Sequence, residues 1–100
     1  IKASFLVAGL TGQLGLPEFD DLNRTFVSAP FQWNQIRKFA GEVFVYHATN
    51  DPYVPIEQAY EIGKGLGVQV KEIQNGGHLN AEFGYTQFEE LLCDIDSLAL

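Results

Sequence analysis

The chain contains few of the residues that several large classes of protein need. Only six of its 100 residues are Lys or Arg, against 13 Asp or Glu, and the formal net charge is −7. Binding to nucleic acid or to an anionic membrane surface needs a basic face, which so few cations do not provide. No apolar run approaches the ~20 residues of a membrane-spanning helix. We therefore expect neither a nucleic-acid nor a membrane partner.

Cysteine and methionine are also scarce. The one cysteine, Cys93, cannot form an internal disulfide, which is compatible with the reducing cytoplasm, where we expect the protein to reside. The chain has no methionine, and Ile1 already opens a strand-like apolar run. We therefore expect residues 1–100 to be the carboxyl-terminal part of a single domain, cut or processed from a longer protein.

Three apolar runs are typical of parallel strands. Residues 3–8 and 43–48 are apolar without alternation, as interior strands covered by helices on both faces require. Residues 68–73 alternate in part, with Gln69 and Lys71 polar, which is expected of a strand nearer the sheet edge. A hydrophobic content of 46% agrees with a packed interior.

Segments with helical spacing separate and follow these runs. Apolar residues recur every three to four positions in residues 33–40, 55–67 and 88–98. Thr86 and Glu89 have the spacing of a capping box that would start the last helix. Because parallel strands need crossover connections, the order predicts an α/β domain of three layers, with about three parallel strands.

The stretch from Gly9 to Pro30 lacks this regularity. It contains three glycines within seven residues, at positions 9, 12 and 15, and shows few periodic signals. We expect a long loop or a small excursion here, and loops of this length in compact domains are often functional.

Asp51 and His78 are the candidate catalytic residues, because each follows one of two successive predicted strands. The carboxyl ends of parallel strands meet at one edge of a sheet, so the two side chains should face each other there. A triad acid accepts the Nδ1 proton of the histidine and fixes its tautomer, and an imidazole, with an ordinary pKa of about 6.5, suits proton transfer. Either residue alone would be read as a turn or surface residue. Together they predict the acid and base of a Ser-His-Asp triad.

A nucleophile is missing from the sequence. The elbow Gly-x-Ser-x-Gly occurs nowhere, and Ser4, Ser28 and Ser97 lack its glycines. Cys93 follows the histidine and lies within a predicted helix, where we expect an inert, buried thiol. In an α/β-hydrolase the nucleophile precedes the acid and the histidine. We therefore expect it before Ile1, and we expect this chain alone to be inactive.

His47 ends the second predicted strand close to Asp51. It is interpreted as a core or rim histidine, although a place in the wall of the active-site pocket remains open. A metal site made of His47, Asp51 and His78 is disfavoured, because their spacing matches no common ligand pattern. We expect no cofactor and no metal.

Three segments carry a resemblance to a known family: Phe31-Gln-Trp33-x-x-Ile36, His47-Ala-Thr-Asn-Asp51-Pro-Tyr-Val-Pro55 and Asn75-Gly-Gly-His78. They resemble the carboxyl half of the small serine hydrolases of the retinoblastoma-binding protein 9 type. The resemblance extends from about Ile1 to the last predicted helix. It implies a parallel sheet of six or seven strands and esterase-like activity on small acyl substrates. It also implies a Ser-His-Asp triad in which Asp51 is the acid and His78 the base.

The sequence thus predicts the carboxyl-terminal portion of an α/β-hydrolase whose whole protein cleaves a small acyl substrate. The expected partners are the missing amino-terminal half of the fold, or a second copy that associates through the first strand. The alternative is a non-catalytic protein-interaction module on a hydrolase scaffold, which would use residues 9–30 or an exposed sheet edge. An upstream Gly-x-Ser-x-Gly would favour the enzyme.

Overall fold

The computed structural model describes residues 1–98. Its elements in chain order are β1 (Ala3–Val7), α1 (Pro17–Val27), α2 (Trp33–Ala40), β2 (Glu42–Ala48), α3 (Ile56–Leu66), β3 (Val70–Ile73), the short 3-10 helix η1 (Ala81–Phe83) and α4 (Glu89–Ser97). The three strands form one parallel sheet in the order β1-β2-β3. The predicted parallel α/β architecture is confirmed. β1 was expected in the interior, but in the described sheet it lies at an edge.

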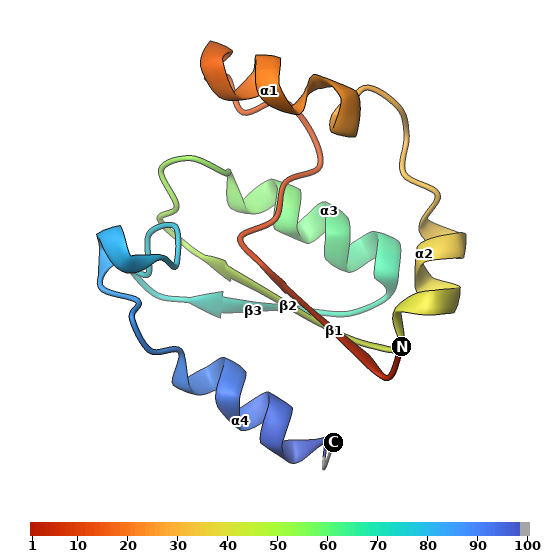
Figure 1. Ribbon diagram of the computed structural model, residues 1–100, viewed down its shortest axis with the longest axis vertical. Helices are drawn as coiled ribbons and strands as arrows, with labels where there is room; N and C mark the ends of the chain where they lie inside the picture. Colours follow the sequence, from red (N-terminus) through yellow and green to blue (C-terminus); the bar gives the residue numbers. More distant parts are fainter. Residues whose placement is uncertain (99–100) are drawn as a thin grey trace.

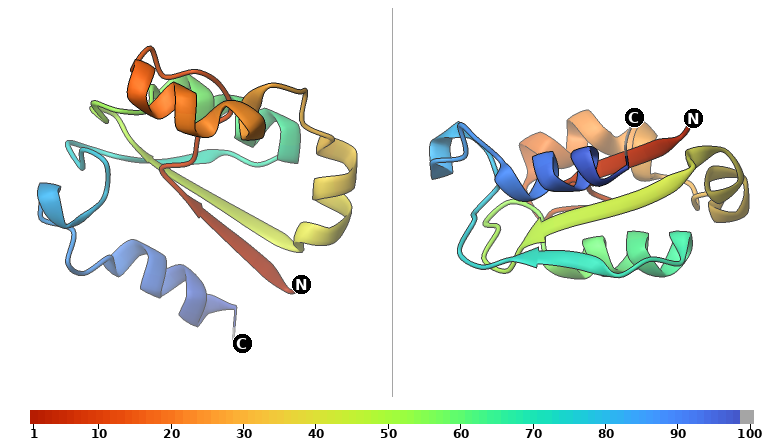
Figure 2. Two further views of the ribbon diagram at one scale, coloured as in Figure 1. Left: turned by 45° about the horizontal axis from the view of Figure 1, so that its top comes forward. Right: turned by 90° about the horizontal axis from the view of Figure 1, so that it is seen from below.

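Helices cover both faces of this sheet, which gives three layers. Figures 1 and 2 show α3 on one side of the strands and α4 on the other. On the α3 face, Val45 of β2 packs against Ala59, Ile62 and Leu66. Tyr46 and Ala48 of β2 point to the opposite face, where they form a second cluster. Leu79, Phe88 and Leu91 complete this cluster. Successive residues of β2 are therefore apolar because each face has its own helix.

The second crossover helix, α3, has the boundaries that its sequence predicts. It begins directly after Pro55 and ends at Gly67, whose left-handed φ of 74° a residue without Cβ adopts easily. Gly65, near the end of α3, lies against the indole of Trp33, and a Cβ there would come within 2.3 Å of the ring. This glycine lets α2 pack closely against α3.

Residues 9–30, for which we expected a long loop or a small excursion, contain the helix α1 at Pro17–Val27, so the long loop is wrong. Proline is tolerated in the first turn of a helix, where its missing N–H is not needed. No residue of α1 is buried, and Figure 1 shows the helix at the outside of the fold. The signal in the sequence that indicates this helix is the three-to-four spacing of Phe19, Leu22 and Phe26.

The last helix differs from its prediction in two respects. It begins at Glu89, and the residue before it, Phe88, has a non-helical backbone and makes no side-chain cap, so the predicted capping box of Thr86 and Glu89 is wrong. Cys93 is exposed, not buried. Phe88 and Leu91 face the sheet, and Cys93 lies off that stripe. Within residues 1–98, none of the helices has the length and apolar character needed to span a membrane.

Candidate active site

Asp51 lies in the turn that follows β2, the central strand of the described sheet. Its side chain has no exposed surface. One carboxylate oxygen, Oδ1, accepts hydrogen bonds from the backbone N–H groups of Tyr53 at 2.8 Å and Val54 at 3.0 Å. These bonds hold the carboxylate in one orientation and leave Oδ2 to face a second partner.

That partner is His78, in the loop between β3 and η1. Its Nδ1 donates a hydrogen bond to Asp51 Oδ2 at 2.8 Å, a distance typical of a triad acid and base. The His78 side chain is 30% exposed, so its other nitrogen, Nε2, is available to a reacting group. The structure thus brings together the two residues that the sequence singled out.

The environment of Asp51 keeps its carboxyl group ionised. Burial by itself raises the pKa of Asp51. The hydrogen bond from His78, together with those from the backbone of Val54 and Tyr53, outweighs burial, and the pKa lies below its ordinary value. An ionised acid is what a triad needs to stabilise the imidazolium that forms during turnover.

The two glycines before His78 have different roles. Gly77 adopts a left-handed φ of 63°, and a Cβ there would lie 2.3 Å from the ring of Phe83. Gly76 needs no such conformation, but a Cβ at that position would lie 2.6 Å from the side chain of Leu79. Only Gly77 therefore uses the conformational freedom of a glycine, whereas Gly76 provides space for Leu79.

Tyr53 supports the histidine from the side. Its ring meets that of His78 edge to face, with centroids 5.3 Å apart and planes 88° apart. Its hydroxyl donates to Glu82 Oε1 at 2.8 Å, which anchors Tyr53 to η1. Sequence reasoning did not find this contact, because it joins two loops that no spacing pattern connects.

A cavity of about 460 Å³ adjoins His78 and extends from Tyr53 toward α1. Its wall is largely apolar, and among the described residues that line it Glu82 is the one Asp, Glu, Lys or Arg. The wall also includes Leu10, Leu14, Phe19, Asn23 and Asn80. A wider hollow of about 760 Å³ lies between β3 and α4 but contains neither Asp51 nor His78. We place the candidate active site at the smaller cavity because His78, the histidine of the pair, lines it.

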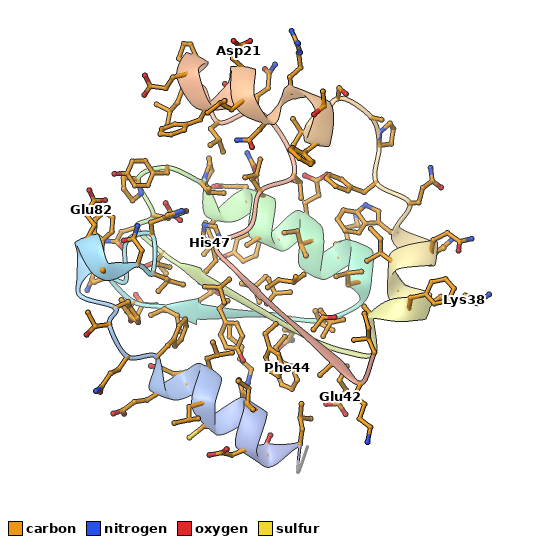
Figure 3. All side chains as sticks on the ribbon, in the orientation of Figure 1. Asp21, Lys38, Glu42, Phe44, His47 and Glu82 are labelled. Atoms are coloured by element: carbon orange, nitrogen blue, oxygen red, sulfur yellow. The ribbon has the colours of Figure 1, made fainter. Side chains whose placement is uncertain are left out.

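His47 is a core histidine and is not among the residues that line this cavity. Its side chain is fully buried, and Figure 3 shows it inside the fold. Its Nε2 donates to the carbonyl oxygen of Val54 at 2.8 Å and lies 3.4 Å from Asp51 Oδ2. In the part of the chain that the structure describes, no group of three or more His, Cys, Asp or Glu residues is arranged to hold a metal ion.

The serines of the chain serve the backbone or lie apart from the cavity. The Ser4 hydroxyl donates to the Ala40 carbonyl at 2.8 Å, and the Ser97 hydroxyl donates to the Asp94 carbonyl at 2.7 Å. Ser28 caps the end of α1. Among the described residues, neither a serine nor a cysteine lines the cavity at His78.

Comparison with known proteins places this chain in a family. A profile described as serine hydrolase matches residues 1–97. The chain belongs to this serine hydrolase family. It is 27% identical over 100 residues to the Serine hydrolase RBBP9 of Rattus norvegicus, and the alignment covers 98% of this chain and 50% of that protein. The predicted family is confirmed.

The fold has a counterpart among solved structures. The crystal structure of the ydeN gene product from B. subtilis matches with a TM-score of 0.85 and 23% identity, over 95% of this chain and 50% of that one. The match confirms a partial α/β-hydrolase fold. The chain therefore spans about half the length of each of these two proteins.

Proposed function

We propose that these residues supply the acid, Asp51, and the base, His78, of a Ser-His-Asp triad that hydrolyses small esters or similar acyl bonds. The observation that carries the proposal is the 2.8 Å hydrogen bond from His78 Nδ1 to Asp51 Oδ2, made by a buried carboxylate that two backbone N–H groups hold in place. Membership of the serine hydrolase family supports the same chemistry.

In the proposed reaction His78 moves the protons. Its Nε2 takes the proton of the serine hydroxyl as the serine oxygen bonds to the acyl carbon, and then gives that proton to the departing alkoxide. In the second half of the reaction His78 takes a proton from a water molecule as the water oxygen bonds to the acyl carbon, and then gives that proton to the departing serine oxygen. This step releases the carboxylic acid product and the free serine. Asp51 keeps the His78 proton on Nδ1, which leaves the Nε2 lone pair directed at the nucleophile, and stabilises the imidazolium.

The nucleophile of this proposal comes from outside these 100 residues. Their sequence contains no Gly-x-Ser-x-Gly, and they match half of each of the two relatives. We propose that the other half of the fold supplies the serine, so that the 100-residue chain alone does not hydrolyse esters and does not react with a fluorophosphonate. Stoichiometric labelling of Ser4, Ser28 or Ser97, detected by mass spectrometry, would show that a nucleophile lies within this chain.

The test uses a protein that carries both these residues and the elbow serine, assayed with a short activated ester such as p-nitrophenyl acetate. We expect His78→Ala to abolish turnover. We expect Asp51→Asn to lower kcat by up to about 10⁴-fold, because it leaves the imidazole in the wrong tautomer. Asp96→Asn, an exposed position on α4, is the matched control. Wild-type rates for both site variants would assign the chemistry elsewhere.

The alternative proposal is a non-catalytic interaction module. Two features support it: α1 exposes Leu22 and Phe26, which are 76% and 74% exposed, and β1 has an unpaired edge in the described sheet. Hydrolysis that depends on His78 and Asp51 would rule against this alternative. Substitution of Leu22 and Phe26 by Lys, without effect on ester hydrolysis, would separate any binding by α1 from the catalytic site.

A further inference from the structure

The buried histidine at the end of β2 has an unusual set of contacts. His47 precedes Asp51 by four residues, and its side chain has no exposed surface. Its Nε2 makes one hydrogen bond, to the carbonyl oxygen of Val54, and its Nδ1 is buried without a partner in the part of the chain that the structure describes. The proposed reaction does not use this residue.

These contacts determine where the His47 proton resides. A carbonyl oxygen only accepts hydrogen bonds, so the 2.8 Å contact with Val54 requires a proton on Nε2. A proton on the buried Nδ1 would have no acceptor. His47 is therefore the Nε2–H tautomer, and Nδ1 is a buried acceptor without a donor. An unpaired buried acceptor lowers stability, and an apolar ring of the same size would avoid that loss, so packing alone does not account for a histidine here.

The hydrogen bond from His47 to Val54 helps to hold the turn that carries Asp51 in one conformation. Val54, which is 2% exposed, donates its N–H to Asp51 Oδ1 and accepts the His47 Nε2–H at its carbonyl oxygen. Both peptide groups that flank the Val54 Cα are therefore held in place. The same Nε2 lies 3.4 Å from Asp51 Oδ2, the oxygen that accepts from His78.

We propose that His47 is a positioning residue for the triad acid: its Nε2–H fixes the Val54 carbonyl and flanks Asp51 Oδ2, so that this oxygen stays aimed at His78. The inference rests on the proposed function of Asp51, and it concerns a residue that touches neither substrate nor nucleophile. In this arrangement the imidazole of His47 acts through the Asp51 turn, and His78 acts on the substrate.

The experiment compares two substitutions in the protein that carries both halves of the fold. His47→Phe fills the space but removes the donor, whereas the amide nitrogen of His47→Gln can replace the Nε2–H. We expect His47→Phe to lower kcat about tenfold, the equivalent of one hydrogen bond, with little change in KM, and His47→Gln to recover most of the loss. Tyr46→Phe, the neighbouring residue on the opposite face of the sheet, should leave kcat unchanged.

A second readout does not depend on turnover. In long-range ¹H–¹⁵N spectra of the same protein, His47 should carry its proton on Nε2, and His78 should show a slowly exchanging Nδ1–H. His47→Phe should weaken the His78 Nδ1–H signal while amide dispersion stays as in the wild type, and His47→Gln should restore it. A merely structural role would change stability without this selective change.

Three results would overturn the inference. The first is a wild-type His47 that carries its proton on Nδ1. The second is a folded His47→Phe variant whose kcat and His78 Nδ1–H signal equal those of the wild type. The third is a His47→Gln variant whose kcat and His78 signal are no higher than those of His47→Phe. If His47→Phe does not fold, the tautomer of His47 in the wild type and the spectra of His47→Gln still test whether His47 positions Asp51. Failure of the proposed function is recognised separately, as wild-type kcat in Asp51→Asn and His78→Ala while the His78 signal still depends on His47.

Discussion

Asn50 and Gly77 join the two loops of the site, because the Asn50 side-chain oxygen accepts a hydrogen bond from the Gly77 N–H at 2.9 Å. Asn50 directly precedes Asp51, and Gly77 directly precedes His78. The bond therefore lies one residue before each member of the proposed pair, and it aligns the acid-bearing loop with the histidine-bearing loop independently of the contact between Asp51 and His78.

Asn50→Ala should loosen this alignment. It leaves the partly buried Gly77 N–H without its acceptor, so we expect a loss of about 1 kcal/mol in the free energy of unfolding, measured by urea titration. Ester hydrolysis should also fall, with the larger effect on kcat. Asn34→Ala, an exposed position in α2, is the control and should be neutral or slightly stabilising. Equal effects of the two substitutions would count against a role for Asn50 in alignment.

Gly77→Ala should be more harmful than the same change at Gly84. Both glycines have left-handed φ angles, 63° and 86°, which cost an alanine roughly 1–2 kcal/mol. At Gly84 an added Cβ meets nothing within 4 Å, whereas at Gly77 it collides with Phe83. The difference in unfolding free energy between the two variants therefore measures the collision alone. Equal destabilisation would mean that Phe83 moves aside freely.

The stability of the fold should depend on pH through Asp51. Its pKa is lowered in the folded state, so the unfolded chain binds the proton more tightly. The contribution of Asp51 is therefore complete above the unfolded pKa of about 3.9 and is lost as the pH falls through the lower folded pKa. Asp51→Asn should make the dependence of unfolding free energy on pH shallower in that acid range.

Asp94 adds a second acid-sensitive contribution. The hydrogen bonds from Lys71 and from the Tyr46 hydroxyl lower the pKa of Asp94, so its effect has the same sign as that of Asp51. Part of the pH dependence should therefore remain in Asp51→Asn and become smaller when Asp94→Asn is added. An unchanged slope in Asp51→Asn would contradict the contribution assigned to that carboxylate.

The isolated chain should associate through β1. In the described sheet this strand is paired on one side only, and an unpaired edge is a template for another strand. We expect a sedimentation series to show mass increasing with concentration, and we expect the other half of the fold, added in trans, to compete. The double variant Leu22→Lys and Phe26→Lys, which alters the exposed side of α1, should still associate. A cooperatively folded monomer at every concentration would refute association through the β1 edge.

The parallel sheet was predictable because β2 is apolar at successive positions, which only a strand covered on both faces requires. α1 was not predicted, because the glycines at positions 9, 12 and 15 and Pro17 favoured a loop over the three-to-four spacing of Phe19, Leu22 and Phe26. The capping box at Thr86 matched a local rule, but the chain is not helical until after Phe88, whose ring packs against Tyr46 and Tyr85. Tertiary packing thus overrode a local signal.

The pairing of Asp51 and His78 could be foreseen, because chain order and strand position place both loops at one sheet edge. The contacts that surround the pair could not. Asn50 reaches Gly77 and Tyr53 reaches Glu82 across two loops, at separations that follow no helical or strand period. For His47 the sequence indicated proximity to Asp51, but only the structure shows which nitrogen is bonded and which is left without a partner.

Asp51 and His78 follow strands that differ in length and in the number of paired edges. Asp51 follows β2, which spans seven residues and is bonded on both sides, whereas His78 follows β3, which spans four and is bonded on one side in the described sheet. Amide protons of a short edge strand exchange through local opening, while those of a central strand await global unfolding. Gentle heating or dilute denaturant should therefore open β3 and displace His78 while Asp51 keeps its position after β2. Loss of activity on heating would then precede global unfolding.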